Sequence, residues 1–208
     1  MVLTIDIGNT TIGIGGFQGN KLLFIEKISS RRPLSDAGYI EKLNMILNKH
    51  GLSAEAFEGS MISSVVPSVT AVFSSALETF LGRKPLILSH KLDLGYEICT
   101  EFPEKVGCDR LADIAGAISR YSLPFVTIDL GTATTFNVLD ENRRFLGGLI
   151  LPGVGTAHRA LLGKTAQLPK GDIHMPAHTI GANTQECITG GMLLGNACAI
   201  DGLIRRIQ

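Results

Sequence analysis

The chain carries the turn sequence D-I-G-N-T-T at residues 6–11 and a near copy, D-L-G-T-A-T, at residues 129–134. A short apolar run with β-branched residues precedes each copy, and a second such run follows it. This pattern predicts a strand with a carboxylate at its end, a tight turn and a returning strand. Because the pattern occurs twice within 208 residues, it indicates an internal duplication.

The similarity between the two halves extends beyond the turns. With one gap, residues 19–23 align with residues 141–145. Each half is therefore expected to contain two strands joined by a turn, then a hairpin and a third strand. Convergence of isolated turns would not produce this longer match.

The two turns are chemically suited to phosphate. Gly8 and Gly131 allow the backbone to approach a ligand closely, and the residues after them leave amide and hydroxyl donors in the turn. A single D-x-G-x-T match is more often a plain hairpin with a solvated aspartate. The pair favours a polyphosphate that is held on two sides together with its cations.

Composition narrows the class of protein. Lys plus Arg and Asp plus Glu both total 19, so net charge gives no reason to expect nucleic acid or an anionic membrane as a partner. The amino-terminal apolar run ends at Asp6, too early for a signal peptide, and no membrane-spanning run is expected. The four cysteines have neither disulfide-framework nor zinc spacing. We expect reduced thiols in a soluble, cytoplasmic protein.

The remaining segments predict an α/β fold. In the first half, helices are expected over residues 37–47 and 69–81, with strands over residues 60–67 and 85–88. The order β-β-β-α-β-α-β implies a mixed sheet covered by helices. A further helix over residues 109–120 connects the halves.

The second half is expected to have glycine-rich loops over residues 147–155 and a long helix over residues 185–206. If it copied the first half in full, two more strands and another helix would follow. Either the second domain is naturally abbreviated or the sequence belongs to a longer polypeptide. Loss of the segment that completes the second sheet would expose the apolar stretch over residues 192–204.

A third group of residues, K-V-G-C-D-R-L-A-D at 105–113, lies at the predicted start of the connecting helix. There, backbone amides and the Arg110 side chain can bind an anionic group, and the Asp109 carboxylate can accept a proton from a substrate hydroxyl. The alternative is that Asp109 only caps the helix and Arg110 points to water. These residues alone leave both readings open.

With D-x-G-N-T, G-x-D-R and D-x-G-T in that order, the chain resembles the type III pantothenate kinases over essentially its whole length. Shorter matches continue at residues 147–153, 165–169 and 180–184. The resemblance implies the acetate and sugar kinase, Hsp70 and actin superfamily, with two ribonuclease-H-like domains closing over ATP. We assign these domains to residues 1–118 and 119–208, the second of them incomplete. The implied reaction is ATP-dependent phosphorylation of pantothenate to 4'-phosphopantothenate, the first step of coenzyme A biosynthesis.

The same resemblance implies a role for individual residues. Asp109 would be the general base, and Asp129 would bind the monovalent cation, K⁺ or NH₄⁺. Mg²⁺ would accompany ATP, with Asp6 the nearest carboxylate. A homodimer is implied, with the substrate site near its interface. The ATP-binding residues would be Asp6, Ile7, Gly8, Asn9, Thr10, Thr11, Ile12, Gly13 and Thr132, and the pantothenate site would include Gly107, Cys108, Asp109, Arg110, Thr184 and Thr100.

Two positions depart from the family pattern. Cys108 replaces the usual alanine, a small apolar change, and Thr100 stands where many members have a tyrosine that contacts pantothenate. His158 is a weaker candidate for the substrate site, whereas His174 and His178 are expected in loops.

Two alternatives to a pantothenate kinase stay open. One is a non-catalytic nucleotide-binding regulatory protein of the same fold, and the other is a kinase of another small alcohol. A P-loop kinase is excluded, because the sequence G-x-x-x-x-G-K-[ST] does not occur.

Overall fold

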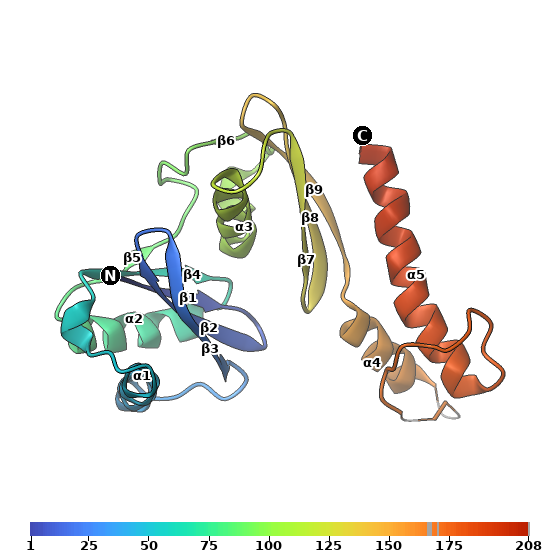
Figure 1. Cartoon of the computed structure of the whole chain (residues 1–208), viewed down its shortest axis with the longest axis horizontal. Helices are drawn as coiled ribbons and strands as arrows, with labels where there is room; N and C mark the ends of the chain where they lie inside the picture. Colours follow the sequence, from blue (N-terminus) through green and yellow to red (C-terminus); the bar gives the residue numbers. More distant parts are fainter. Residues whose placement is uncertain (166–167, 170, 208) are drawn as a thin grey trace. The chain divides into compact units, whose positions relative to one another are not determined.

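The computed structural model describes residues 1–165, 168–169 and 171–207 (Figure 1). The described chain forms two compact units. Unit 1 comprises Met1–Leu123 and Leu139–Leu146, and unit 2 comprises Pro124–Val138 and Gly147–Gln208. The domain division at residue 118 stays a prediction.

Unit 1 is built on a five-stranded mixed sheet, as the sequence predicts. The strand order is β3-β2-β1-β4-β5, with β1 antiparallel to β2 and parallel to β4. The turn at residues 8–10 joins β1, the central strand, to β2, so the first D-x-G-x-T sequence lies at one end of the sheet's centre. The strands are β1 (Val2–Ile7), β2 (Thr11–Gln18), β3 (Lys21–Ser29), β4 (Gly59–Ser64) and β5 (Leu86–Ile87).

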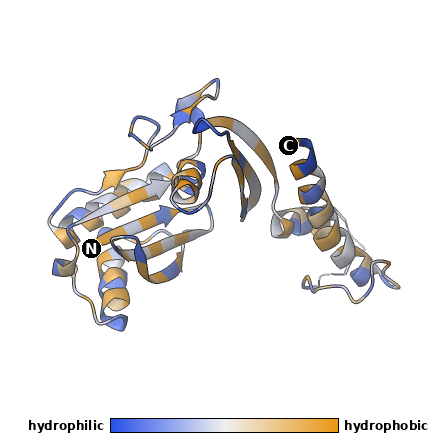
Figure 2. Cartoon of the chain, turned by 45° about the horizontal axis from the view of Figure 1, so that its top comes forward, coloured by the Kyte–Doolittle hydropathy of each residue, from blue (hydrophilic) through white to orange (hydrophobic). Residues whose placement is uncertain are grey.

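Two helices, α1 (Asp36–Lys49) and α2 (Pro67–Leu81), pack against this sheet and form the core (Figure 2). The rings of Tyr39 and Phe73 are both fully buried, with their centroids 4.5 Å apart. Each fully buried side chain of this size contributes roughly 1.5–3 kcal/mol of transfer free energy. This packing fixes the sheet that carries the first turn.

The predicted strand over residues 60–67 extends too far. β4 ends at Ser64, and Pro67 is the first residue of α2. Proline is favoured at this position because its missing N–H has no partner in the first turn of a helix. At the other end, Gly82 closes α2 in the left-handed conformation, with φ 67°, as predicted.

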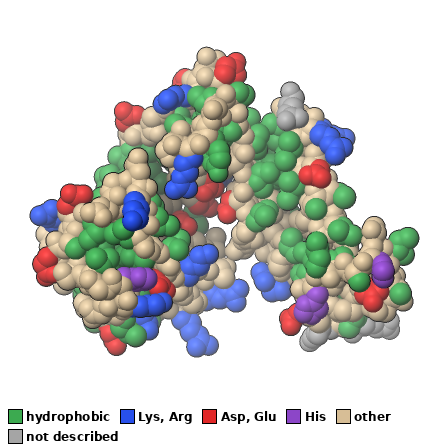
Figure 3. Space-filling view, viewed as in Figure 1, with side chains coloured by type: hydrophobic (Ala, Val, Ile, Leu, Met, Phe, Trp, Pro, Cys, Tyr) green, Lys and Arg blue, Asp and Glu red, His purple; other side chains and the backbone are tan. Residues whose placement is uncertain are grey.

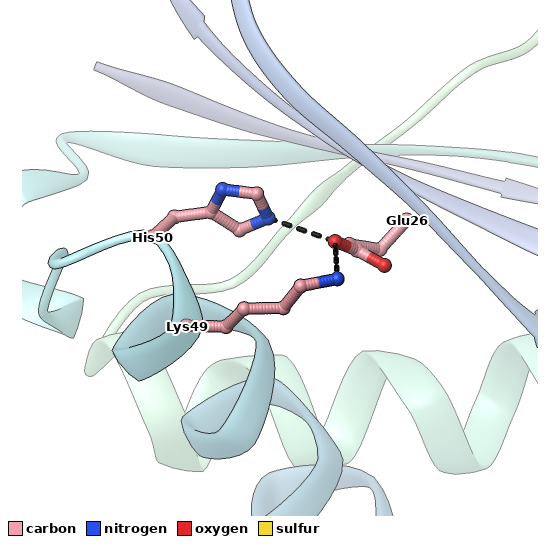
Figure 4. A network of polar contacts seen from close by, with 3 residues as sticks. All are labelled: Glu26, Lys49 and His50. Carbon is pink, nitrogen blue, oxygen red and sulfur yellow. Dashed lines mark hydrogen bonds and ion pairs between the residues drawn. The ribbon is translucent and has the colours of Figure 1, made fainter.

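A cluster of polar side chains joins β3 to the end of α1 (Figure 4). Glu26 Oε1 lies 2.7 Å from Lys49 Nζ and 2.8 Å from His50 Nε2. The imidazole of His50 also stacks on the ring of Phe24, with centroids 4.6 Å apart. The hydrogen bonds from Lys49 and His50 lower the pKa of the Glu26 carboxyl.

The second sheet has four strands in the order β6-β9-β8-β7. β6 runs parallel to β9, whereas the short connections of β7 to β8 and of β8 to β9 make hairpins. The second sheet is therefore mixed as well. Its strands are β6 (Glu97–Ile98), β7 (Phe125–Leu130), β8 (Ala133–Leu139) and β9 (Arg144–Pro152).

The prediction of glycine-rich loops over residues 147–155 is wrong for most of that range. Gly147 and Gly148 lie within β9, and Gly147 has a φ of 114°. Strand pairing outweighs their local preference for turns. Only Gly153 lies outside regular structure, where it is the N-cap of α4 (Val154–Lys164), a helix that was not predicted.

The helices α3 (Cys108–Ile118) and α5 (Thr184–Ile207) confirm the predicted helices over residues 109–120 and 185–206. Asn183 and Glu186 exchange hydrogen bonds at the start of α5: Glu186 N donates to Asn183 Oδ1, and Asn183 Nδ2 donates to Glu186 Oε1. This capping arrangement fixes where the helix begins.

Most apolar side chains of the helix α5 are partly buried, and few are fully buried (Figure 3). By length and composition alone it would be able to cross a membrane, with 17% of its most apolar 18-residue window buried. The expectation that no run reaches the length of a membrane span was wrong for this helix. Length and composition are weak evidence for a membrane span.

Candidate functional site

The first predicted phosphate-binding turn is a tight connection in unit 1. Gly8 N donates to the Thr11 carbonyl oxygen at 3.0 Å. A β-carbon at Gly8 would lie 3.3 Å from that same oxygen, which is tighter than most such contacts. The backbone of Asp6 pairs with Gly13 on the returning strand. Backbone pairing therefore joins the predicted residues 6–13 into the end of one hairpin.

The start of α3 brings Gly107, Cys108, Asp109 and Arg110 together in the same unit. Gly107 is the N-cap, and no side chain caps the helix. Asp109 Oδ1 accepts a hydrogen bond from Arg110 N at 2.8 Å. The carboxylate therefore lies at the amino end of the helix, where the helix dipole favours negative charge. Asp109 is therefore not the N-cap of α3, although its carboxylate accepts from an N–H of the first turn.

Val65 links the first turn to the start of α3. Its N–H donates to the Ile7 carbonyl oxygen at 3.1 Å, and its Cγ1 atom lies 3.6 Å from the β-carbon position of Gly107. Both predicted groups are thus adjacent to the residue that follows β4. The sequence analysis did not identify Val65 as a site residue, and its one signal was the V-V-P sequence that ends the predicted strand over residues 60–67.

The side chains beside Asp109 are partly buried, and burial changes their titration. Burial lowers the pKa of Arg110, while the charges of Asp109 and Asp113 oppose that shift. Burial raises the pKa of the Cys108 thiol, which donates to the Leu88 carbonyl oxygen at 3.1 Å. Cys108 is therefore a poor candidate for a reactive thiolate.

Thr100 lies close in sequence to β6, and its Oγ1 atom is buried without a hydrogen-bond partner among the described residues. Nearby, the Tyr96 hydroxyl donates to the Leu111 carbonyl oxygen at 2.9 Å. Burial, followed by the charge of Asp113, raises the pKa of Tyr96 well above its ordinary value. Tyr96 therefore braces α3, and its hydroxyl does not replace the tyrosine that many family members have at position 100.

The second predicted turn lies in unit 2. Gly131 N donates to the Ala133 carbonyl oxygen at 2.9 Å, and Asp129 is the penultimate residue of β7. The Thr132 carbonyl oxygen accepts from Gly153 N at 3.1 Å and from Thr156 Oγ1 at 2.7 Å. The start of α4 thereby holds the second turn, a support that the sequence analysis missed.

A cavity of about 390 Å³ adjoins this turn within unit 2. It is mainly apolar, with Thr134 and Asn196 as its polar side chains. Thr184, the other predicted residue of this unit, is exposed at the first position of α5. The cavity is lined by Leu130, Gly131, Thr134, Val154, Gly155, Leu193, Asn196, Ala197 and Ile200.

The predicted histidines and the T-A-Q-L-P motif lie as follows. His158 lies on α4 with its Nε2 atom buried and without a partner in the described chain, while His174 and His178 lie outside helices and strands, as expected. Ala166 and Gln167 of the motif at residues 165–169 lie outside the described residues.

The predicted cation ligands are single carboxylates. Within residues 1–165, 168–169 and 171–207, no three His, Cys, Asp or Glu side chains cluster as they would around a protein-held metal ion. A single carboxylate, as predicted for Asp6, would suffice for Mg²⁺ that is ligated mainly by phosphate and water. Asp129, whose Oδ2 atom lies 3.3 Å from the β-carbon position of Gly131, fits a cation bound at the second turn.

Comparisons with known proteins agree with these features. A family model described as type III pantothenate kinase matches residues 2–206. The type III pantothenate kinase of Thermomicrobium roseum is 37% identical over 208 residues, covering 100% of this chain and 80% of the relative. That of Dictyoglomus turgidum is 36% identical over 206 residues, covering 99% and 80%.

Among solved structures, a conserved Campylobacter jejuni protein named as a Baf family transcriptional activator superposes with a TM-score of 0.56. The match covers 97% of this chain and 78% of that chain at 17% identity. At this identity the likeness shows a shared fold alone. Together with the two mixed sheets and their flanking helices, it confirms the predicted α/β fold class.

Proposed function

This chain belongs to the type III pantothenate kinase family, and we propose that it transfers the γ-phosphoryl group of ATP to the primary hydroxyl of pantothenate. This would be the first step of coenzyme A biosynthesis. The observation that carries the proposal at the level of the site is the Asp109 carboxylate at the amino end of α3, beside Arg110.

In this proposal Asp109 is the general base. A primary alcohol is a weak nucleophile, and phosphoryl transfer depends mainly on alignment and charge neutralisation, with a base accepting the hydroxyl proton. In the described chain the one hydrogen bond to this carboxylate comes to Oδ1 from Arg110 N. That bond would orient the carboxylate toward the acceptor hydroxyl. The hydroxyl proton would pass to Asp109 as the new P–O bond forms and the bond between the γ-phosphorus and the β–γ bridging oxygen breaks, so that ADP leaves.

The phosphates of ATP would be bound by the first turn, residues 6–13, and by Thr132 of the second turn. The tight hydrogen bonds of both turns support this role, because they hold backbone donors in fixed positions. Asp129 would hold K⁺ or NH₄⁺, and Asp6 would face Mg²⁺ that accompanies ATP. These cations would supply neutralisation of phosphate charge.

The acceptor would be bound by Gly107, Cys108 and Arg110, with Thr184 and Thr100 as further contacts. Pantothenate carries a carboxylate, and a guanidinium binds carboxylates with two parallel hydrogen bonds. The half-buried position of Arg110 supports this role, since its charge is less screened than at the surface. We also propose a cytoplasmic homodimer, on the strength of the family resemblance.

Thr100 favours one second candidate, a kinase of another small alcohol. Its Oγ1 atom is buried without a hydrogen-bond partner among the described residues, at the position where many family members have a tyrosine. Rates with pantothenate and with shorter hydroxy acids would separate the two candidates. A higher kcat/KM with a different alcohol would show that this alcohol, and not pantothenate, is the acceptor.

The proposal is tested by ADP formation with and without pantothenate, each in potassium and in sodium buffer. We expect turnover that depends on pantothenate and is faster in potassium. ATP hydrolysis that is indifferent to pantothenate would contradict the proposal. Equal rates in the two buffers would contradict the cation role of Asp129 alone.

A further inference from the structure

The side chain of Arg110 packs on an aromatic ring from a distant part of the sequence. Its Cζ atom lies 5.3 Å from the ring centroid of Phe145, on β9. Phe145 is fully buried, and Arg110 is half-buried. At this distance the negative face of the ring attracts a guanidinium, more strongly when the cation is partly removed from water.

The position of Phe145 is fixed by its own backbone and by its neighbours. Its carbonyl oxygen accepts a hydrogen bond from Cys99 N at 2.9 Å, and it pairs with Ile98 on β6. The preceding hairpin turn is closed by Asp140, whose carboxylate accepts from Arg144 N at 2.8 Å and from Arg144 Nε at 2.8 Å. The ring is therefore a rigid surface beneath a flexible side chain.

Arg110 also experiences two acidic neighbours on its own helix. The charges of Asp109 and Asp113 both stabilise its charged form. A contact with a carboxylate orients a guanidinium but also offsets its charge. The ring of Phe145 carries no net charge, so it helps to position the side chain without adding to the carboxylate charge around it.

We infer that Phe145 is a positioning residue for Arg110, and that it thereby sets the affinity for the carboxylate end of the acceptor. This inference rests on the proposed function and extends it to a residue that does not touch the substrate. Its effect would appear in acceptor binding, since the side chain that the ring contacts, Arg110, is the one proposed to bind the acceptor.

The first test is Phe145→Leu, which keeps an apolar side chain and removes the ring. We expect the KM for pantothenate to rise about fivefold to thirtyfold, the range that corresponds to loss of a partly desolvated cation–π contact. The KM for ATP and kcat should stay within about twofold. The matched control is Phe73→Leu, the same change at another fully buried ring of unit 1 that packs on Tyr39.

A second variant separates the ring's electronic role from its volume. Phenylalanine with three fluorine atoms on the ring, inserted at position 145, keeps the packing and weakens the negative face of the ring. We expect a rise in the KM for pantothenate that is smaller than in Phe145→Leu, and no change when the same residue replaces Phe73. A purely structural role for Phe145 would leave the fluorinated variant like the unaltered protein.

The outcomes distinguish this inference from the proposed function. If the unaltered protein phosphorylates pantothenate and the fluorinated variant has an unchanged KM for it, the positioning role of Phe145 is wrong and the proposed function stands. If the unaltered protein is folded and binds ATP but does not phosphorylate pantothenate, the proposed function fails and the inference fails with it. Should Phe145→Leu not fold, the fluorinated variant alone decides.

Discussion

The Oδ1 atom of Asp109 occupies the space that a β-carbon would take at Gly107. Gly107 has a φ of −60°, so its backbone conformation is open to any residue. The glycine is therefore required by the carboxylate above it, and not by the backbone. The first G of the G-x-D-R sequence leaves room for the proposed base.

Gly107→Ala should displace the Asp109 carboxylate and lower kcat by about 10-fold to 100-fold, because small displacements of a reacting group are costly. Alanine is also a poorer N-cap than glycine, which should cost about 1 kcal/mol of stability. Steady-state kinetics and thermal unfolding would measure both effects. Gly116→Ala is the matched control, since a β-carbon at Gly116 on the same helix meets no atom within 4 Å; an equal loss of kcat there would refute the steric argument.

Gly153→Ala should disturb the second turn. A β-carbon at Gly153 would overlap the Gly131 carbonyl oxygen and lie 2.9 Å from the Thr132 carbonyl oxygen. We expect the KM for ATP to rise by about 10-fold or more, on the scale of one lost charge-assisted hydrogen bond. The KM for pantothenate should change less.

The control for this change is Gly163→Ala on the same helix, where a β-carbon meets no atom within 4 Å. That variant should keep the wild-type KM for ATP. A Gly153→Ala protein that binds ATP normally would show that α4 does not hold the second turn in its working geometry.

Cys108→Ala should have little effect on catalysis. The thiol donates one hydrogen bond, to the Leu88 carbonyl oxygen at 3.1 Å, and burial raises its pKa, so it is not a nucleophile at neutral pH. We expect kcat/KM for pantothenate within about twofold of wild type and a stability loss of about 1 kcal/mol or less. A loss of activity much above that range would assign the thiol a direct role in the acceptor site.

Stability in acid should depend on Glu26. Its carboxyl has a lowered pKa in the folded protein, so the ion pair stabilises the fold above the ordinary value of 4.5 and this contribution is lost as pH falls below it. Glu26→Gln should lower Tm by at most a few degrees at pH 7, as expected for an exposed ion pair. At pH 3 the difference from wild type should shrink.

Glu41→Gln provides the comparison, because Glu41 is exposed on α1 and forms no ion pair within the described chain. Its Tm should follow wild type at both pH values. A Glu26→Gln difference that is the same at pH 7 and pH 3 would show that the cluster in Figure 4 does not act through the charge of Glu26.

The local features of the fold could be predicted from the sequence. The strands around Asp6 and Asp129 alternate or cluster apolar residues and are separated by glycine-containing turns, which are short-range signals. The start of α3 at residue 108 was within one residue of its predicted position. Each of these features depends on residues within a few positions of one another.

Contacts between distant segments could not be predicted in the same way. β6 has two residues, and it exists as a strand because it pairs with residues 144 and 145 of β9. Gly147 also lies within β9, which is bonded to β6 and β8, although its local preference indicated a loop. The packing of Arg110 on Phe145 likewise depends on the tertiary fold. The sequence therefore predicts the helix start that carries Asp109, whereas the contact between Arg110 and Phe145 is visible only in the structure.

The central claim is that this chain phosphorylates pantothenate with Asp109 as the base. The most direct measurement is the formation of 4'-phosphopantothenate from pantothenate and MgATP, detected by mass spectrometry, for wild type and Asp109→Asn at matched ATP occupancy. We predict product with wild type and a rate about 100-fold lower or more with Asp109→Asn, the scale of general-base catalysis. Product at the wild-type rate from Asp109→Asn, or none from a folded, ATP-binding wild type, would contradict the account.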